Sequence, residues 1–206
     1  FSIYPKSFHY FQSAKKKQDK ALGLLRRKLA MLEDMGYIKK NKLTQKGEIA
    51  SSLFGYELVL SEMNEEGALE PMSEVELAML MAALIFEPRK GDRAGHLGIM
   101  SDNLRKKAEH YHRIIHRKEA KYKIIPYTKP LHFHLSKAIR AWTEGDDFEQ
   151  LFRLTSVDEG ELVRYFRMVI QLLRELSFAP HVSEPLKEKA REARRLINRG
   201  VVDAEK

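Results

Sequence analysis

Three arginines and a glutamine recur at helical spacing toward the C-terminal end of the sequence, in a pattern that fits binding chemistry. Arg164, Arg167, Gln171 and Arg174 are separated by three, four and three residues, so on a helix they form one narrow stripe. Such a stripe can serve as a polar track for a phosphate chain or for stacked bases. The alternative interpretation is an ordinary solvated helix face.

The helix that must carry this stripe is predicted over residues 159–178. Asp158 with Glu161 can act as N-cap and reciprocal cap, and Ser156 with Glu159 offers an alternative start. Apolar residues follow at helical spacing and predict a broad buried face. They are Leu162, Val163, Phe166, Val169, Ile170, Leu172, Leu173 and Leu176.

The histidines are a second group of residues that could bind a ligand, in this case a metal ion. His112 and His116 have the i, i+4 spacing of a helical metal site, with His110 nearby, but Arg113 stands where a zincin helix needs glutamate. The surrounding lysines and arginines would repel a dication, so we predict no metal site. His132 and His134 alternate on a predicted helix and should not share a face. Trp142 is interpreted as a core residue rather than a stacking platform.

The motifs of several enzyme classes are absent from the sequence. It contains no P-loop, no dinucleotide-binding fingerprint and no Gly-x-Ser-x-Gly elbow. We therefore predict no catalytic residue and no bound cofactor in this chain.

Composition is typical of a globular chain of one large or two small domains. The 206 residues are 43% hydrophobic and 32% charged, and the longest apolar run, 77–86, is too short to span a bilayer. The absence of cysteine excludes disulfides and thiolate zinc sites and fits a cytoplasmic location. With no export signal and a first residue that is Phe1, the sequence is expected to be a fragment of a longer protein without membrane contact.

Charge is segregated along the sequence. Residues 1–47 carry 12 Lys and Arg against 3 acids, residues 48–88 carry 9 acids and no Lys or Arg, and residues 89–123 carry 11 against 4. The remainder, 124–206, carries 14 against 13. The pattern predicts basic surfaces for a polyanion, with an acidic element between them.

Hydrophobic periodicity and breakers predict a mainly α protein. The expected helices are 13–35, 56–66, 74–86, 99–123, 131–143, 148–154, 159–178 and 186–198. The first has Leu22, Leu25, Leu29 and Leu32 at three- and four-residue offsets and ends at Gly36, while 74–86 is apolar all round and belongs in the core. Ser73 with Glu76 forms a capping box for that core helix. Residues 89–98 are expected to be a loop.

Residues 37–50 are expected to contain the only strands. Tyr37 and Ile38 would start one short strand and Leu43 with Thr44 the other, separated by a basic loop. A helix followed by such a hairpin and by Leu-Thr-x-Lys-Gly is typical of a winged helix. We therefore predict a helical bundle with a small winged-helix-like portion at its N-terminal end, divided into residues 1–55 and 56–206.

Taken together, several segments resemble the C-terminal part of the Ski-like superfamily-two DExH helicases, the group with a DSHCT domain. Residues 32–38 and 43–50 are similar to the family's "L-x-x-L-G-[YF]-x" and "L-K-G-R-V-A" segments. Residues 57–63, 80–87 and 141–155 match further family segments in the same order, and 7–12 resemble the helix before the family's stalk. Residues 158–167 are similar to "E-G-[SD]-[IL]-[IV]-R-x-x-R-R".

This resemblance implies an accessory region of an ATP-dependent helicase, which binds the translocating single strand, RNA being favoured over DNA, through a "ratchet" helix at 159–178. It implies that Arg164, Arg167 and Gln171 contact the strand, and that the RecA-like domains of the parent chain bind ATP and Mg²⁺. The sequence departs from the family at Glu161 and at Met168, which replaces an arginine. Two alternatives stay open: a stand-alone winged-helix protein that binds duplex DNA, and a protein-interaction module.

Overall fold

Helices make up most of the chain in the computed structural model, which describes residues 5–89, 92 and 98–203. The elements are α1 (Pro5–Asp34), β1 (Ile38–Lys39), β2 (Lys42–Leu43), α2 (Gln45–Ser51), α3 (Glu57–Glu65), α4 (Glu74–Ile85), α5 (Ile99–Lys121), η1 (Phe133–Leu135), α6 (Ser136–Glu144), η2 (Phe148–Arg153), α7 (Glu159–Phe178), α8 (Glu184–Ile197) and η3 (Gly200–Val202). The mainly α class is thus confirmed. The loop predicted at 89–98 lies largely outside the described residues.

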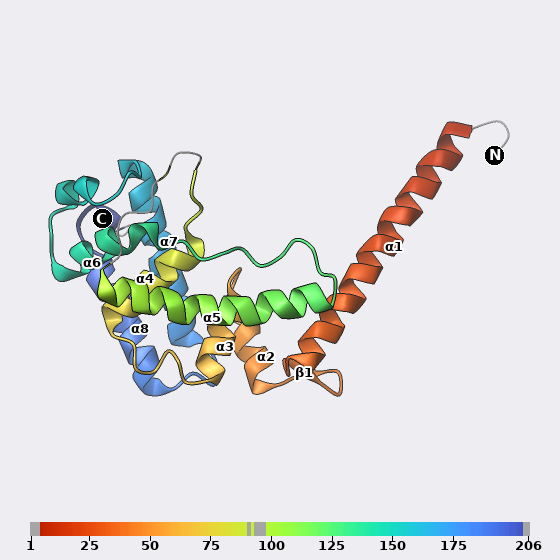
Figure 1. Ribbon diagram of the computed structural model, residues 1–206, viewed down its shortest axis with the longest axis horizontal. Coiled ribbons are helices and arrows are strands. Elements are labelled where there is room, and N and C mark those ends of the chain that lie inside the picture. The colour runs from red at the N-terminus through yellow and green to blue at the C-terminus, as the bar shows by residue number, and fades with distance from the viewer. Residues whose placement is uncertain (1–4, 90–91, 93–97, 204–206) are drawn as a thin grey trace.

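Helix α1 leaves the rest of the molecule as a long arm (Figure 1). It begins at Pro5, eight residues earlier than predicted, because proline fits the first turn of a helix and no breaker follows it. Its 30 residues span about 45 Å. Leu22, Leu25 and Leu29 lie on it as predicted, but each is exposed. The helix ends at Asp34, and the φ of +80° at Gly36, two residues later, confirms the predicted left-handed position.

The hairpin after α1 has two-residue strands that pair antiparallel. Lys40 and Asn41 both have positive φ, as a tight hairpin turn requires. Contrary to the prediction, Tyr37 and Thr44 lie outside the strands, and residues 45–51 form helix α2. Thr44 caps α2 by accepting a hydrogen bond from the Gly47 amide at 3.2 Å. The described residues contain no further strand, so the winged-helix portion stays a prediction.

Helix α4 is the centre of the bundle. Every residue from Leu77 to Ile85 is buried, as its all-round apolar sequence predicts, and the helix packs against α5, α6, α7 and α8. The predicted capping box is confirmed: the Glu76 amide donates to Ser73 Oγ at 3.2 Å, and the Ser73 amide donates to Glu76 Oε2 at 2.9 Å. Local sequence therefore fixes where this central helix starts.

Helix α7 has the predicted bounds and the predicted N-cap residue, but the predicted capping hydrogen bonds do not form. Asp158 is the N-cap residue and makes no side-chain capping bond, and the alternative start at Ser156 is not used. Glu161 does not act as a reciprocal cap, because its carboxylate binds Arg89 Nη2 at 2.6 Å. The interaction with a residue 72 positions away replaces the local one.

Two other helix starts differ from the prediction. Helix α8 begins at Glu184 rather than at 186, because Ser183 caps it and Pro185 fits its first turn instead of breaking the chain. The helix expected at 131–143 is the short η1 followed by α6 (Ser136–Glu144), and His132 has extended backbone. Within the described ranges, no helix is long and apolar enough to cross a membrane.

Ion pairs fix the place where α1 meets α5. Asp34 Oδ2 lies 2.9 Å from Lys118 Nζ and 3.0 Å from Lys121 Nζ. The hydrogen bond from Lys118, followed by the one from Lys121, lowers the pKa of Asp34 to about 2.

We expect an NMR titration of the Asp34 carboxyl to give a midpoint near 2 instead of its ordinary 3.8. Because the pKa is lowered in the folded state, the ion pairs contribute to stability above the ordinary value and are lost as the pH falls through about 2. Replacing both Lys118 and Lys121 by alanine should return the midpoint toward 3.8. A normal midpoint in the unaltered chain would contradict the pairing.

Candidate nucleic-acid interface

The four residues predicted to form a stripe lie together along the solvent side of α7. We call Arg164, Arg167, Gln171 and Arg174 the α7 stripe; all four are exposed. On the opposite side, Leu162, Phe166, Val169 and Leu173 are fully buried against the bundle. Helical periodicity thus places the apolar and polar residues as predicted, while Tyr165 joins the buried set although it was not included in the predicted face.

Arg164 is held loosely. Its guanidinium carbon lies 4.5 Å from the centroid of the Tyr165 ring, and Nη2 lies 3.4 Å from Glu161 Oε1. The same carboxylate oxygen makes a shorter contact of 2.6 Å with Arg89. Exposed ion pairs of this kind stabilise by about 0–1 kcal/mol, so exchanging Glu161 for a phosphate would cost Arg164 little.

Arg167 and Gln171 are oriented by neighbours that the sequence does not reveal. Arg167 Nε donates to the carbonyl oxygen of Val202 at 3.1 Å, so the C-terminal segment holds one edge of its guanidinium. Gln171 Nε2 donates to Glu175 Oε1 at 3.0 Å. Across the described chain, neither Arg167 nor Arg174 forms an ion pair with an acidic side chain. Their remaining donors are therefore available to an anionic ligand.

Two residues beside the stripe were not predicted. Arg89 reaches Glu161 at the N-terminal end of α7 and adds a cation there. Phe54, which is 77% exposed, is tied to the other end by a hydrogen bond of 3.2 Å from its amide to Glu175 Oε2. Its ring is an exposed aromatic surface of the type on which bases stack. Both residues are distant in sequence from α7, so no local pattern could have identified them.

Trp142 is a core residue, as predicted. It is 2% exposed, and its Nε1 donates to the carbonyl oxygen of Ile197 at 2.8 Å. Arg199 covers the ring, with its guanidinium carbon 3.5 Å from the centroid. No face of this indole is open to a base.

The histidines of α5 have structural contacts. His112 Nε2 lies 3.0 Å from the carbonyl oxygen of Thr128, and the His116 ring lies 4.3 Å from that of Tyr127, between centroids. Among the described residues, no group of three His, Cys, Asp or Glu side chains is arranged to hold a metal ion.

His132 and His134 were predicted not to share a helix face, yet their rings lie 5.7 Å apart. The helical assumption was wrong, because η1 starts only at Phe133. Burial lowers the pKa of both imidazoles, and the nearby charge of His134 lowers that of His132 further. Both rings therefore favour the neutral form.

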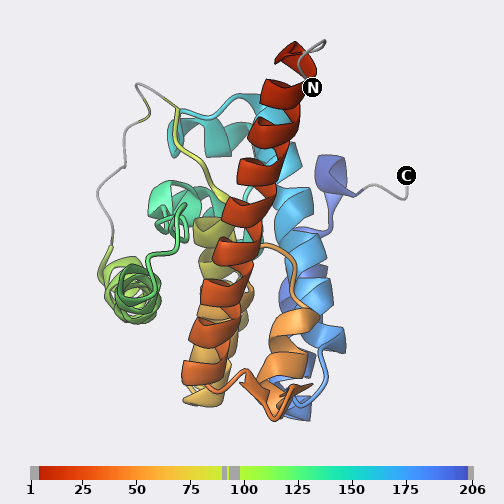
Figure 2. The ribbon, with the colours of Figure 1, turned by 90° about the vertical axis from the view of Figure 1, so that its right-hand side faces the viewer.

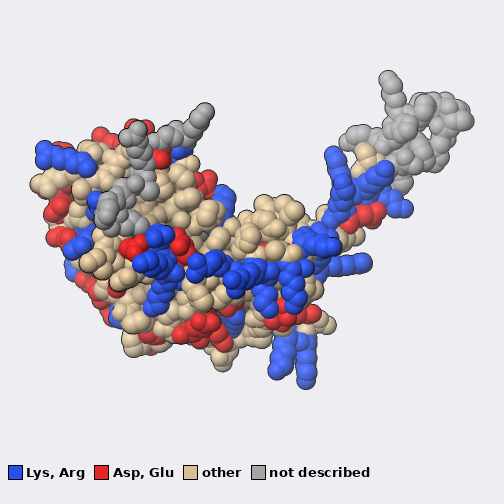
Figure 3. Space-filling model, in the orientation of Figure 1, with Lys and Arg blue, Asp and Glu red and all other residues tan. Residues whose placement is uncertain are grey.

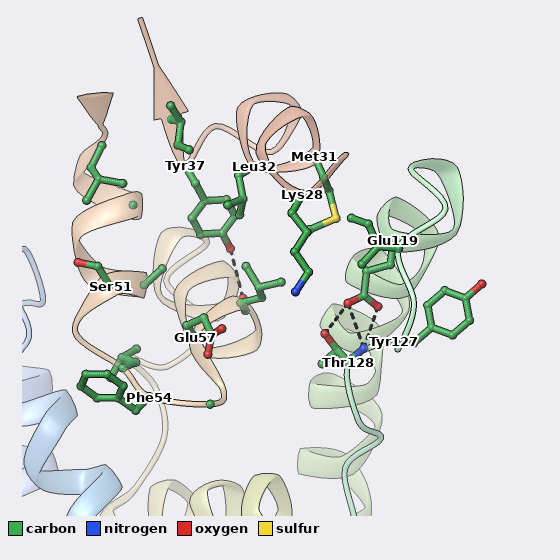
Figure 4. A pocket seen from close by; sticks show the side chains of 18 of the residues that line it. Lys28, Met31, Leu32, Tyr37, Ser51, Phe54, Glu57, Glu119, Tyr127 and Thr128 are labelled. Carbon is green, nitrogen blue, oxygen red and sulfur yellow. Dashed lines mark hydrogen bonds between the residues drawn. The ribbon is translucent and has the colours of Figure 1, made fainter. Parts of the chain in front are cut away.

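A cavity of about 510 Å³ lies between the end of α1, the hairpin, α3 and the 124–128 segment (Figure 4). Its lining is mostly apolar, and the Lys28 side chain extends into it. Glu119 is buried beside it, where it accepts hydrogen bonds from the Thr128 amide and hydroxyl. The cavity was not predicted, because it forms only where α1 meets elements distant in the sequence.

Comparison with known proteins places this architecture in a family. The DSHCT (NUC185) domain model matches residues 40–205, so the chain belongs to the DSHCT family. The resemblance to the C-terminal region of Ski-like DExH helicases is thereby confirmed.

Individual relatives agree with this assignment. The chain is 26% identical to "ATP-dependent RNA helicase mtr4" of Schizosaccharomyces pombe over 91% of its own length. It is 25% identical to "Antiviral helicase SKI2" of Saccharomyces cerevisiae over 90%, and 26% identical to human "Exosome RNA helicase MTR4" over 71%. It spans only 18%, 16% and 14% of these three proteins, respectively.

Proposed function

We propose that this chain is the C-terminal accessory region of an ATP-dependent RNA helicase, and that α7 is its ratchet helix. The observation that carries the proposal is the α7 stripe, which lies exposed on a well-packed helix of a DSHCT domain. Similarity to proteins named as RNA helicases, such as those of Schizosaccharomyces pombe and human, favours RNA as the bound nucleic acid.

The resemblance to the DExH helicases implies a division of roles between this chain and the rest of the parent protein. The RecA-like pair of the parent protein binds ATP and Mg²⁺ and pushes a single strand past the bundle. Arg164 and Arg167 contact phosphates or stack on bases, and Gln171 hydrogen-bonds a base edge. Each base held in this way resists back-slipping by about 1–3 kcal/mol. Within this division, residues 1–55 form the winged-helix-like portion and residues 56–206 the bundle.

The proposal predicts that the double variant Arg164→Ala, Arg167→Ala binds single-stranded RNA at least about tenfold more weakly at low salt, since each lost contact weakens binding by about 1–3 kcal/mol. The slope of log K against log salt should fall by about 1.4, or about 0.7 per lost phosphate contact. Fluorescence anisotropy with a labelled oligouridine of about 12 nucleotides measures both quantities.

A matched control removes the same charge elsewhere. Arg191 and Arg195 on α8 are paired with glutamates at 2.5 Å and face solvent. Their double alanine variant should bind RNA within about twofold of the unaltered chain, since such surface pairs contribute little. Unchanged affinity of the Arg164, Arg167 variant would refute the ratchet assignment.

A further inference from the structure

The fold brings two basic segments together on one side of the molecule, although the acidic segment 48–88 separates them in the sequence. Lysines and arginines run along α5 and continue onto α1 (Figure 3). The junction is fixed by Asp34 of α1, which pairs with Lys118 and Lys121 of α5. The two basic segments of the sequence thus form one surface.

Several cations of this surface have no acidic partner. Some lysines are neutralised within it, since Lys106 pairs with Asp102, and Lys118 and Lys121 pair with Asp34. Five of the others, which lie near the junction or along α5, are exposed and form no ion pair with any residue that the structure describes. We call them the outer basic track: Lys20, Arg27, Arg113, Arg117 and Lys123.

The track is continuous across the junction. A shallow hollow of about 520 Å³ separates α1 from the turn after α5, and Lys20, Arg27 and Lys123 all line it, together with the acidic Asp19. Gly23, also in the lining, has no side chain to fill the hollow. Further along α5, Arg113 and Arg117 are one helical turn apart and therefore share a face. Cations thus follow the surface from one helix to the other.

Unneutralised like charges at this spacing are unfavourable. Two cations at i and i+4 repel each other and slightly destabilise a helix, and a bound polyanion removes that repulsion. Guanidinium groups match phosphate geometry, and binding a phosphate chain releases its counterions. The exposed His116 ring, which is tilted by 43° against the ring of Tyr127, lies on the same helix face as Arg113 and offers an aromatic surface as well.

The track lies apart from the α7 stripe. Helix α4 packs against α5 and against α7, and Figure 2 shows α5 end-on at one side of the bundle and α7 at the other. A nucleic-acid strand bound to the α7 stripe therefore does not occupy the outer basic track. We propose that the outer basic track is a second RNA-binding surface, which holds the phosphodiester backbone without reading sequence. This proposal does not depend on the role of α7.

The test uses the triple variant Arg113→Ala, Arg117→Ala, Lys123→Ala of the full chain. Anisotropy titrations with single-stranded and with duplex RNA should both be run, because either form presents the same backbone. For whichever of the two RNA forms the unaltered chain binds, we expect the affinity of the triple variant at low salt to be at least about tenfold lower. The salt slope should fall by about 2 for single strands and by nearly 3 for duplex.

The matched control is Arg140→Ala, Arg191→Ala, Arg195→Ala, three exposed arginines that are each paired with glutamate. It should bind within about twofold of the unaltered chain. Equal losses in both triple variants would mean that net charge alone governs binding, and would overturn the proposal. Thermal melting checks folding, and Lys20→Ala, Arg27→Ala tests the α1 end of the track should the triple variant unfold.

The experiments test the two proposed surfaces independently of each other. If the track variant binds both RNAs like the unaltered chain while the Arg164, Arg167 variant is weakened, the track proposal is wrong and the ratchet assignment stands. The reverse result would support the track and refute the ratchet assignment. If both surfaces bind separately, their effects on the binding free energy should add.

Discussion

Replacing Trp142 by alanine is expected to lower the free energy of unfolding by about 3–5 kcal/mol, the range for a large aromatic removed from a core. The indole lies 5.7 Å from the ring of Phe148 and 6.0 Å from that of Phe166, between centroids. Its Nε1 holds the end of α8 through the carbonyl oxygen of Ile197, and Arg199 stacks on its outer face. The variant therefore loses a core side chain and the anchor of the C-terminal segment together.

Urea denaturation of the two proteins measures this difference. Trp142→Phe is the matched control: it keeps an aromatic ring in the core and loses the Nε1 hydrogen bond and part of the ring volume, so a smaller loss is expected. Because Arg167 donates to Val202 in the same segment, the alanine variant should also bind RNA more weakly if α7 is the ratchet helix. A loss below about 1 kcal/mol, typical of surface positions, would show that the indole is not part of the core.

Replacing Lys46 by methionine is expected to destabilise the chain by about 3 kcal/mol. Lys46 Nζ lies 2.7 Å from Glu62 Oε1, and both side chains are nearly buried, at 12% and 10% exposed. The Tyr37 hydroxyl donates to the same carboxylate at 2.8 Å. Methionine fills the volume of lysine but leaves the Glu62 charge buried without its cation, a change that typically costs about 3–5 kcal/mol.

A double variant separates the charge effect from packing. Lys46→Met, Glu62→Gln removes both charges, so most of the lost free energy of unfolding should return. Tyr37→Phe provides a further comparison, because it removes the hydroxyl that burial holds in its protonated form by raising its pKa. If the single Lys46→Met variant lost less than about 1 kcal/mol, the pair would be behaving like an exposed salt bridge.

The helices with strong local signals were predictable from the sequence. Helix α4 combines a capping box with a continuous apolar run, and α7 combines twenty residues of regular periodicity with a break on each side. Such signals need no distant partner to be recognised. Helix α2 was missed because seven residues hold too few turns to show a period, and because the segment after the predicted strand at Leu43 and Thr44 was interpreted as part of a wing.

Gly47 has a structural role that the sequence motif does not reveal, because it lies very close to the backbone of Tyr37. A Cβ atom at this position would lie 2.2 Å from the carbonyl oxygen of Tyr37, so only glycine fits. The Leu-Thr-x-Lys-Gly segment was noticed for its resemblance to a wing. In the fold, its Thr44 caps α2, its Lys46 neutralises Glu62, and its glycine lets α2 approach the end of α1.

The sequence by itself determined the helical class, the bounds of α7 and the membership of the stripe, because these depend on residues a few positions apart. Tertiary structure decided which residues surround that stripe, since Arg89, Phe54 and Val202 reach it from distant segments. It also decided that the basic residues of α1 and α5 share a surface. The charge of each segment can be counted from the sequence, but the arrangement of these charges in space depends on how the helices pack.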